Sequence, residues 1–322
     1  GSFDFDDPDG GQIPGFAVPR SPGSTLKPVV YAQAIDQGLA LPSFLVEDGP
    51  RVFGSYTPTN FDGRYRGLVR LRDALSASLN VPFVDLLAQI TVPDFIAKLR
   101  SMGVKSLKTA PGAYGLSAAI GGVELTPLEL AAVYGALAQG GLSVRPRIIR
   151  DDEHLSHARV FSAGAAWLTR RALSLKDRPD FPARRAIAAA PPAIHWKTGT
   201  SAGHRDAWAA GSGPTYTAVI WLGNFDRRPS TALVGAQAAG PILFDLLEGV
   251  STKADREHVD QRPDDLVRVK TCANSGYPYS PGCLSTDGDW ALIRQVPTVR
   301  DPFNRLLEHN AAAGQQMPLP CS

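Results

Sequence analysis

The 322-residue sequence has few cysteines, no long apolar run and no strong excess of charge of either sign. No stretch approaches the ~18 consecutive apolar residues of a membrane-spanning helix. The N-terminus also lacks a charged start followed by an apolar core. Lysine and arginine number 33 against 31 acidic residues, and no basic run of the kind that binds phosphate backbones is present. We therefore expect a soluble chain that does not bind nucleic acid.

Cysteine occurs only at Cys272, Cys283 and Cys321. The 11-residue spacing of the first two is wrong for a Cys-x-x-Cys zinc site, and no histidine lies near enough in sequence to complete one. We expect neither a metal nor a cofactor. Segment 272–283 is rich in turn residues and could close a small loop through a disulfide in an oxidising compartment. Three reduced thiols without a role are the alternative.

The composition indicates an ordinary globular chain, 43% hydrophobic and 20% charged, long enough for one large domain and a small one. Eight charged residues between positions 253 and 265 mark a shift in composition. We expect a large domain over 1–250, a charged linker over 251–265 and a small domain over 266–322. Strands at 266–271 and 291–296 are expected in the small domain, which is where one disulfide would stabilise most.

Apolar spacing and capping signals predict a helical first half and a strand-rich second half. Thr126, Pro127 and Glu129 supply a cap, a first-turn proline and a capping-box acid for one helix. A predicted hairpin turns across 212–214. The expected helices are 24–38, 71–79, 84–102 (broken at Pro93), 126–139, 165–174 and 236–248, and the expected strands are 193–200, 206–211 and 216–223. Helices followed by antiparallel strands and a final helix indicate an α+β fold.

Three short motifs occur once each. Ser24-Thr-Leu-Lys27 places a hydroxyl and an amine three residues apart, on one face of a helix whose start Pro28 favours. Ser78-Leu-Asn80 follows 54 residues later, and Lys197-Thr-Gly-Thr200 follows 173 residues after Ser24. A single Ser-x-x-Lys pattern would fit any helix start with an exposed lysine, but the three together in this order favour an acyl-transfer site.

The order of these motifs resembles the active site of the penicillin-binding proteins and serine β-lactamases. Four longer stretches resemble class A penicillin-binding proteins, and segment 269–283 resembles the C-terminal domain of penicillin-binding protein 1C. The stretches are Arg20–Pro28, Tyr56–Asp62, Gly115–Thr126 and Lys197–Trp208. The fold implied is an antiparallel sheet flanked by helices, with a helical lobe and a small β-rich C-terminal domain. Family members carry a membrane helix and a glycosyltransferase domain ahead of the transpeptidase, and neither is expected in this chain.

The resemblance assigns roles to the motif residues. Ser24 is the nucleophile and Lys27 its base, neutral because of burial and the nearby Lys197. Ser78 relays a proton to the leaving amine, and Asn80 bonds both Lys27 and the substrate. Lys197, Thr198 and Thr200 bind a substrate carboxylate, and Gly199 leaves room for its backbone. The amides of Ser24 and Thr200 form the oxyanion hole.

These roles imply a peptidoglycan DD-transpeptidase. It would act on D-Ala-D-Ala stem peptides, bind β-lactams and lie on the periplasmic side of the inner membrane, with possible envelope partners for its C-terminal domain. That location favours the Cys272–Cys283 disulfide. One alternative is a DD-carboxypeptidase or β-lactamase that passes the acyl group to water, although neither Glu124 nor Glu129 has a sequence feature that suggests the water-activating role. Another is a penicillin-binding sensor or docking module with little turnover.

Overall fold

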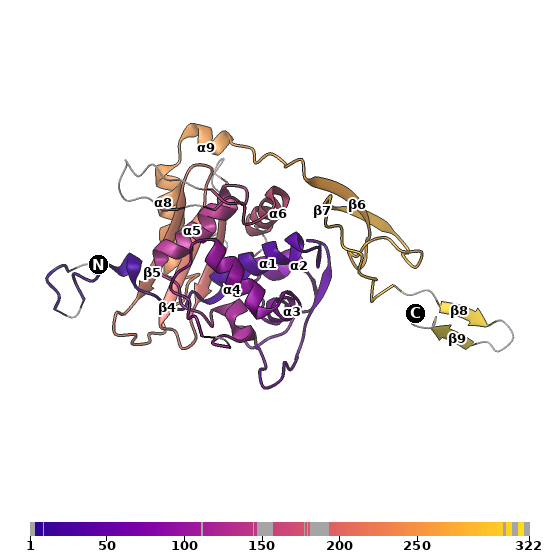
Figure 1. Cartoon of the computed structure of the whole chain (residues 1–322), viewed down its shortest axis with the longest axis horizontal. Coiled ribbons are helices and arrows are strands. Elements are labelled where there is room, and N and C mark those ends of the chain that lie inside the picture. Colours follow the sequence, from indigo (N-terminus) through magenta and orange to yellow (C-terminus); the bar gives the residue numbers. More distant parts are fainter. Residues whose placement is uncertain are drawn as a thin grey trace.

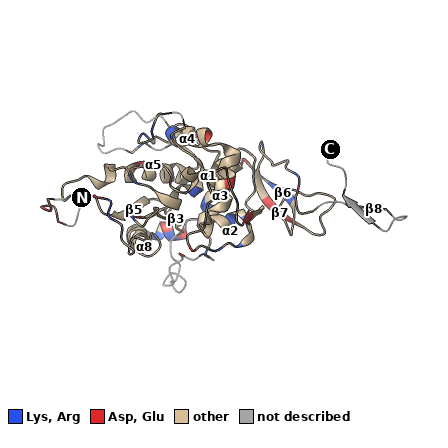
Figure 2. Ribbon diagram, turned by 90° about the horizontal axis from the view of Figure 1, so that it is seen from below, with Lys and Arg blue, Asp and Glu red and all other residues tan. Residues whose placement is uncertain are grey.

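The computed structural model describes residues 4–8, 10–110, 112–143, 145–146, 157–176, 178, 180, 193–304, 307–310 and 315–318. Within this part of the chain, helices precede a central antiparallel sheet, which confirms the α+β class. No helix in these ranges is both long enough and apolar enough to cross a bilayer. Acidic and basic residues are distributed over many elements and neither kind gathers on one of them, as Figure 2 shows.

The central sheet consists of β3 (His195–Thr200), β4 (Asp206–Ser212) and β5 (Thr217–Gly223), paired antiparallel in that order. Helix α5 (Pro127–Ala138) packs on one face and α8 (Ala239–Val250) on the other (Figure 1). Every residue of β4 is buried, as expected for a middle strand covered on both faces. Strand β3 lies at one edge of this sheet, so its outer side is open to other elements.

The helical part is built around α1 (Lys27–Asp36), in which every residue from Lys27 to Ile35 is buried. It follows a 3₁₀ turn, η2 (Gly23–Leu26), and contacts α3 and α6. The surrounding helices are α2 (Leu71–Ser76), α3 (Val81–Ile90), α4 (Val92–Ser101) and α6 (Ala163–Leu173). Shorter elements are η1 (Gly15–Ala17), η3 (Leu116–Ile120), and the strand pair β1 (Leu45–Asp48) and β2 (Gly67–Arg70). One hydrophobic core joins most of these helices.

Most predicted elements are present, with shifts at their ends. The helix break at Pro93 is confirmed, because α3 ends at Ile90 and α4 begins at Val92, and the Thr126/Glu129 capping box has formed. The helix predicted from residue 84 begins three residues earlier. Pro82 occupies the first turn of α3, where a missing amide costs nothing, so a new helix begins at Val81.

The C-terminal part contains α9 (Lys253–Glu257) and two antiparallel strand pairs, β6 (Leu266–Cys272) with β7 (Thr286–Leu292) and β8 (Leu307–Asn310) with β9 (Gln315–Pro318). The predicted strand at 291–296 was misplaced, because β7 begins at Thr286 and ends at Leu292. Its first residues are polar and exposed, so the apolar pattern marked only its buried end. Cys321 lies outside the described residues.

The charged segment and the β6–β7 pair contact the helical part directly. Asp260 accepts hydrogen bonds from two nitrogens of Arg170 in α6, a terminal nitrogen at 2.7 Å and Nε at 3.1 Å, and Asp265 accepts the amide of Gly164 at 3.1 Å. Leu266 and Leu292 belong to the same hydrophobic core as α1. The division into domains at 251–265 stays a prediction, but these contacts tie the segment to α6.

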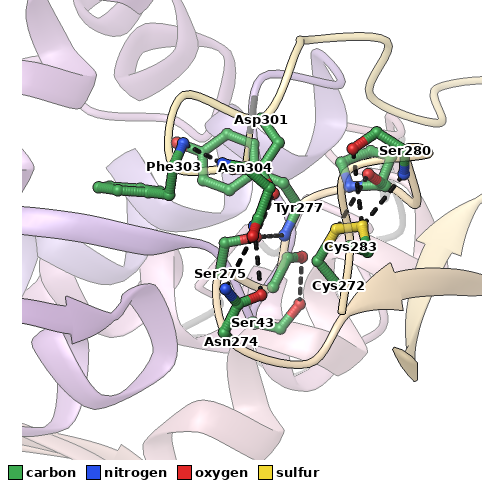
Figure 3. Close-up of a disulfide and its surroundings, with 12 residues drawn as sticks. Ser43, Cys272, Asn274, Ser275, Tyr277, Ser280, Cys283, Asp301, Phe303 and Asn304 are labelled. Carbon is green, nitrogen blue, oxygen red and sulfur yellow. Dashed lines mark hydrogen bonds between the residues drawn. A yellow bond between two sulfur atoms is a disulfide. The ribbon is translucent and has the colours of Figure 1, made fainter. Parts of the chain in front are cut away.

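Cys272 and Cys283 are joined by a disulfide, with their Cα atoms 5.4 Å apart (Figure 3). The loop that it closes contacts the chain near β1, where the amide of Leu45 donates to the carbonyl of Ser275 at 2.8 Å. Ser43 donates its hydroxyl to the carbonyl of Gly276 at 2.9 Å, also seen in Figure 3. Since Gly276 has φ +76° and an added Cβ would lie 1.8 Å from the Ser43 carbonyl oxygen, this contact requires glycine.

Candidate active site

Two glycines bring the Ser24 turn against strand β3. Gly23 has φ +55°, and an added Cβ would lie 2.6 Å from the carbonyl oxygen of Thr200. Gly199 lies on the other side of the contact, where a Cβ would approach the Pro22 carbonyl to 2.4 Å. No side chain fits at either position, so the two backbones touch. Two of the three sequence motifs thus meet at the open edge of the sheet.

The amides of Ser24 and Thr200 face this contact. Ser24 lies in the first turn of η2, where amides have no partner within the helix. In the antiparallel β3–β4 pair, the Ser201 amide bonds the Asp206 carbonyl at 3.0 Å. Because successive residues of a strand alternate in direction, the Thr200 amide points away from β4 and towards the open edge. Two amides therefore lie next to each other beside the partly exposed Ser24.

Lys27 follows Ser24 by one helical turn and is fully buried. Its side-chain nitrogen donates to the Asn80 side-chain oxygen at 2.6 Å and to the Ser78 carbonyl at 2.5 Å, and it lies 3.4 Å from the Ser78 hydroxyl. Burial, and then the charge of Lys197, lower the pKa of Lys27 well below its ordinary value of 10.5, against the opposing effect of Asp48. The neutral amine is thereby favoured, as a general base requires.

Ser78 lies between the two buried lysines. Lys197 donates to the Ser78 hydroxyl at 2.7 Å and to the Thr198 carbonyl at 2.9 Å. Ser78 has φ +59°, a conformation that is rare for residues other than glycine and tends to be kept at functional sites. Burial lowers the pKa of Lys197 to about 7, with Asp180 raising it and Arg178 lowering it.

Asn80 is held by residues that the sequence analysis missed. Its side-chain nitrogen donates to the Thr59 carbonyl at 2.6 Å, and its amide donates to the Asn60 side-chain oxygen at 2.7 Å. Asn60 in turn donates to both carboxylate oxygens of the buried Asp48, at 2.9 and 2.8 Å. Asn60 falls inside the quoted stretch 56–62, whereas nothing in the local sequence marks Asp48.

The two threonines of the third motif have different partners. Thr200 accepts the Gly235 amide through its hydroxyl oxygen at 3.0 Å. Thr198 donates its hydroxyl to the carboxylate of Asp180 at 2.8 Å. Asp180 was not predicted, because it belongs to no recognisable motif.

Together, the residues from the three motifs form a connected set. Lys27, Asn80, Ser78 and Lys197 are linked by hydrogen bonds, and Gly199 and Thr200 lie against the Ser24 turn. A partly exposed hydroxyl beside a buried amine and two amides is an arrangement that can carry out nucleophilic acyl transfer. Cys272, Cys283 and Asp301 also lie close together, but the two sulfur atoms are bonded to each other.

Comparison with protein families decides the assignment. The model of the penicillin-binding protein transpeptidase domain matches residues 15–222, which include all three motifs. The chain belongs to this family. Penicillin-binding protein 1C of Escherichia coli is 36% identical over 303 residues, covering 93% of this chain and 38% of that protein. The chain therefore spans well under half of the length of this relative.

Solved structures agree with the transpeptidase fold. Penicillin-binding protein 1A from Haemophilus influenzae superimposes with a TM-score of 0.70 at 21% identity, covering 87% of this chain and 49% of that one. The PonA1 protein from Mycobacterium tuberculosis, in complex with penicillin V, gives 0.62 at 17% identity over 77% of this chain and 73% of that one. At such identities, the likeness concerns the fold alone.

Proposed function

We propose that this transpeptidase domain forms an acyl-enzyme at Ser24 with D-Ala-D-Ala stem peptides of peptidoglycan and passes the acyl group to the amine of a second stem. The observation that carries the proposal is the pair of buried lysines, Lys27 and Lys197, on either side of the Ser78 hydroxyl and beside the Ser24 turn. The same site would be acylated by β-lactams, and the PonA1 protein with penicillin V provides a precedent in the same fold.

In the proposed first step, neutral Lys27 takes the hydroxyl proton of Ser24, and the oxygen attacks the penultimate D-Ala carbonyl. The amides of Ser24 and Thr200 hold the oxyanion. When the carbon–nitrogen bond breaks, the proton returns from Lys27 through the Ser78 hydroxyl to the departing D-Ala amine. The protonated form of Lys197, beside Ser78, attracts the terminal carboxylate of the donor.

In the second step, an acceptor amine attacks the acyl-enzyme, loses its proton along the same path, and Ser24 is released. Hydrolysis would instead need a base that activates water. Glu129 is unsuited to that role, because it accepts bonds from Ser106, Lys105 and Thr126 at the start of α5. Burial alone would raise the pKa of Glu129, but these bonds lower it and keep the carboxylate ionised. Glu124 is paired with Arg227 at the surface.

The competing function is a hydrolase that passes the acyl group to water. Without a positioned base, water at the acyl carbonyl forgoes general-base assistance of roughly 10²–10⁴-fold. An oriented amine needs less help, because it is the stronger nucleophile. We propose further that the protein lies in the bacterial envelope and that its C-terminal part binds envelope partners.

The experiment follows the acyl-enzyme over time. The chain is labelled with a fluorescent penicillin, excess label is removed, and the adduct is followed with and without an added amine acceptor. We expect a long-lived adduct, and we expect release of D-Ala from a D-Ala-D-Ala peptide to accelerate when the amine is added. Rapid multiple-turnover release of hydrolysed penicillin would show a hydrolase instead.

A further inference from the structure

The hydroxyl of Thr198, which the sequence motif assigns to the donor carboxylate, is hydrogen-bonded to a carboxylate of the protein itself. It donates to Asp180 at 2.8 Å. A threonine hydroxyl has one proton and a carboxylate has none, so Thr198 must be the donor of this bond. While the bond lasts, Thr198 can offer an incoming carboxylate only lone pairs.

Asp180 is fixed in this place by Arg178. The Arg178 guanidinium binds both oxygens of Asp180, once through Nε and once through a terminal nitrogen at 2.9 Å. The side chain of Arg178 is fully buried, lies 3.9 Å above the ring of Trp196, and donates to the carbonyls of Leu173 and Trp196 at 3.0 and 3.1 Å. A bidentate pair of this kind restrains both partners.

The side chains around the Asp180 carboxylate, those of Arg178 and Thr198, are of the kind that form a carboxylate-binding site. A guanidinium and a hydroxyl converge on one carboxylate, next to the β3 edge that carries Lys197. Burial alone would raise the pKa of Asp180, but Arg178 lowers it, so the group is ionised at neutral pH. Its charge neutralises Arg178 and faces any anion that approaches Thr198.

We propose that Asp180 is a specificity-determining residue of the donor site, because its carboxylate takes the Thr198 proton and the Arg178 charge that a donor carboxylate would otherwise use. This inference rests on the proposed function. A donor carboxylate is then bound by Thr200 and Lys197 without Thr198. The site therefore has only a weak preference for donors that end in a charged carboxylate over donors that end in a neutral group.

The test compares a charged and a neutral form of one acylating agent. Benzylpenicillin and its methyl ester react with the wild type and with Asp180→Asn, which keeps the volume and can still accept the Thr198 bond but has no charge. Asp180→Ala also frees the Thr198 proton. Asp260→Asn is the matched control, since it removes the charge from a second arginine–carboxylate pair, the partly buried Arg170–Asp260, away from Thr198.

We expect the acid-to-ester ratio of acylation rates to rise about tenfold in Asp180→Asn, the scale of one charge-assisted hydrogen bond, and further in Asp180→Ala. Asp260→Asn should leave the ratio unchanged. The wild type alone provides a second measurement, independent of variant folding, and its preference for the acid should stay below about tenfold.

Two results would overturn the role of Asp180 while leaving the proposed function intact. One is an acylated wild type that strongly prefers the acid, with a ratio that Asp180→Asn does not change. The other is an equal slowing of both reagents in Asp180→Asn, which would mark a purely structural residue. A wild type that forms no adduct with either reagent would instead contradict the proposed function itself.

Discussion

The side-chain nitrogen of Lys197 lies 2.7 Å from the hydroxyl oxygen of Ser78. The fully buried Lys27 lies 3.4 Å from the same oxygen. Two ammonium groups so close to one hydroxyl would repel each other, and burial adds to the cost of charging either. The structure therefore favours one neutral lysine, Lys27, whose pKa is lowered well below its ordinary value, and one charged lysine, Lys197, at pH values below its pKa of about 7.

The pH dependence of acylation should reflect this difference. Lys197 loses its proton as the pH rises through about 7, so acylation by benzylpenicillin should fall on the alkaline side. In Lys197→Arg the guanidinium stays charged, and the alkaline fall should disappear even if the overall rate drops. Stopped-flow acylation between pH 5 and 9 measures both profiles. An identical alkaline fall in the Arg variant would mean that another group titrates.

Lys27→Arg should abolish acylation, because arginine cannot become neutral and act as the base. We expect a loss of roughly 10³-fold or more, as for removal of a general base. Lys98→Arg is the matched control, since Lys98 lies on a different helix, α4, and is a partly buried lysine that donates to the carbonyl of Val160. Near-normal labelling of Lys27→Arg by fluorescent penicillin would place the base elsewhere.

Gly23→Ala tests the contact between the Ser24 turn and β3. Its new Cβ would clash with Thr200 and separate the two amides of the proposed oxyanion hole, so we expect acylation to fall by about 10²–10³-fold. Gly63→Ala is the control, because Gly63 has φ +69° but open space around an added Cβ. Both variants bear a left-handed strain of about 1–2 kcal/mol.

Comparing Gly23→Ala with Gly63→Ala separates the effect of backbone strain from the effect of the steric clash with Thr200. Thermal unfolding should show a similar loss of stability from strain in both variants, with a further loss in Gly23→Ala. Acylation should be lost in Gly23→Ala alone. Equal acylation rates in the two variants would argue against a role for the Ser24 and Thr200 amides.

Whether a feature could be predicted from the sequence depends on how far apart in the sequence its contacting residues lie. The three motifs and the Thr126 capping box are local patterns, and the site residues Ser24, Lys27, Ser78, Asn80 and Lys197 could be chosen from them. Asp48 and Asp180 could not, because their partners are set by how distant segments fold together. The burial of Asp289 in β7 was equally unpredictable, since Asp289 accepts the amide of Ser43, 246 residues earlier.

The disulfide should stabilise the C-terminal part without affecting the chemistry. A disulfide between residues 11 apart stabilises the folded state by roughly 2–3 kcal/mol, because it lowers the entropy of the unfolded chain. Cys272→Ser combined with Cys283→Ser should therefore lower the unfolding temperature and leave the acylation rate of Ser24 nearly unchanged. In the wild type, an alkylating reagent under non-reducing conditions should modify neither cysteine. Two freely alkylated thiols would contradict the pairing.

The most direct test of the account is the mass of the intact protein after treatment with benzylpenicillin. We predict one covalent adduct per chain, located by peptide mapping on the peptide that contains Ser24, and none on the Ser24→Ala variant. The variant should remain folded, as judged by an unfolding temperature close to that of the wild type. An adduct that persists in folded Ser24→Ala, or that maps to another residue in the wild type, would contradict the assignment of Ser24 as the nucleophile.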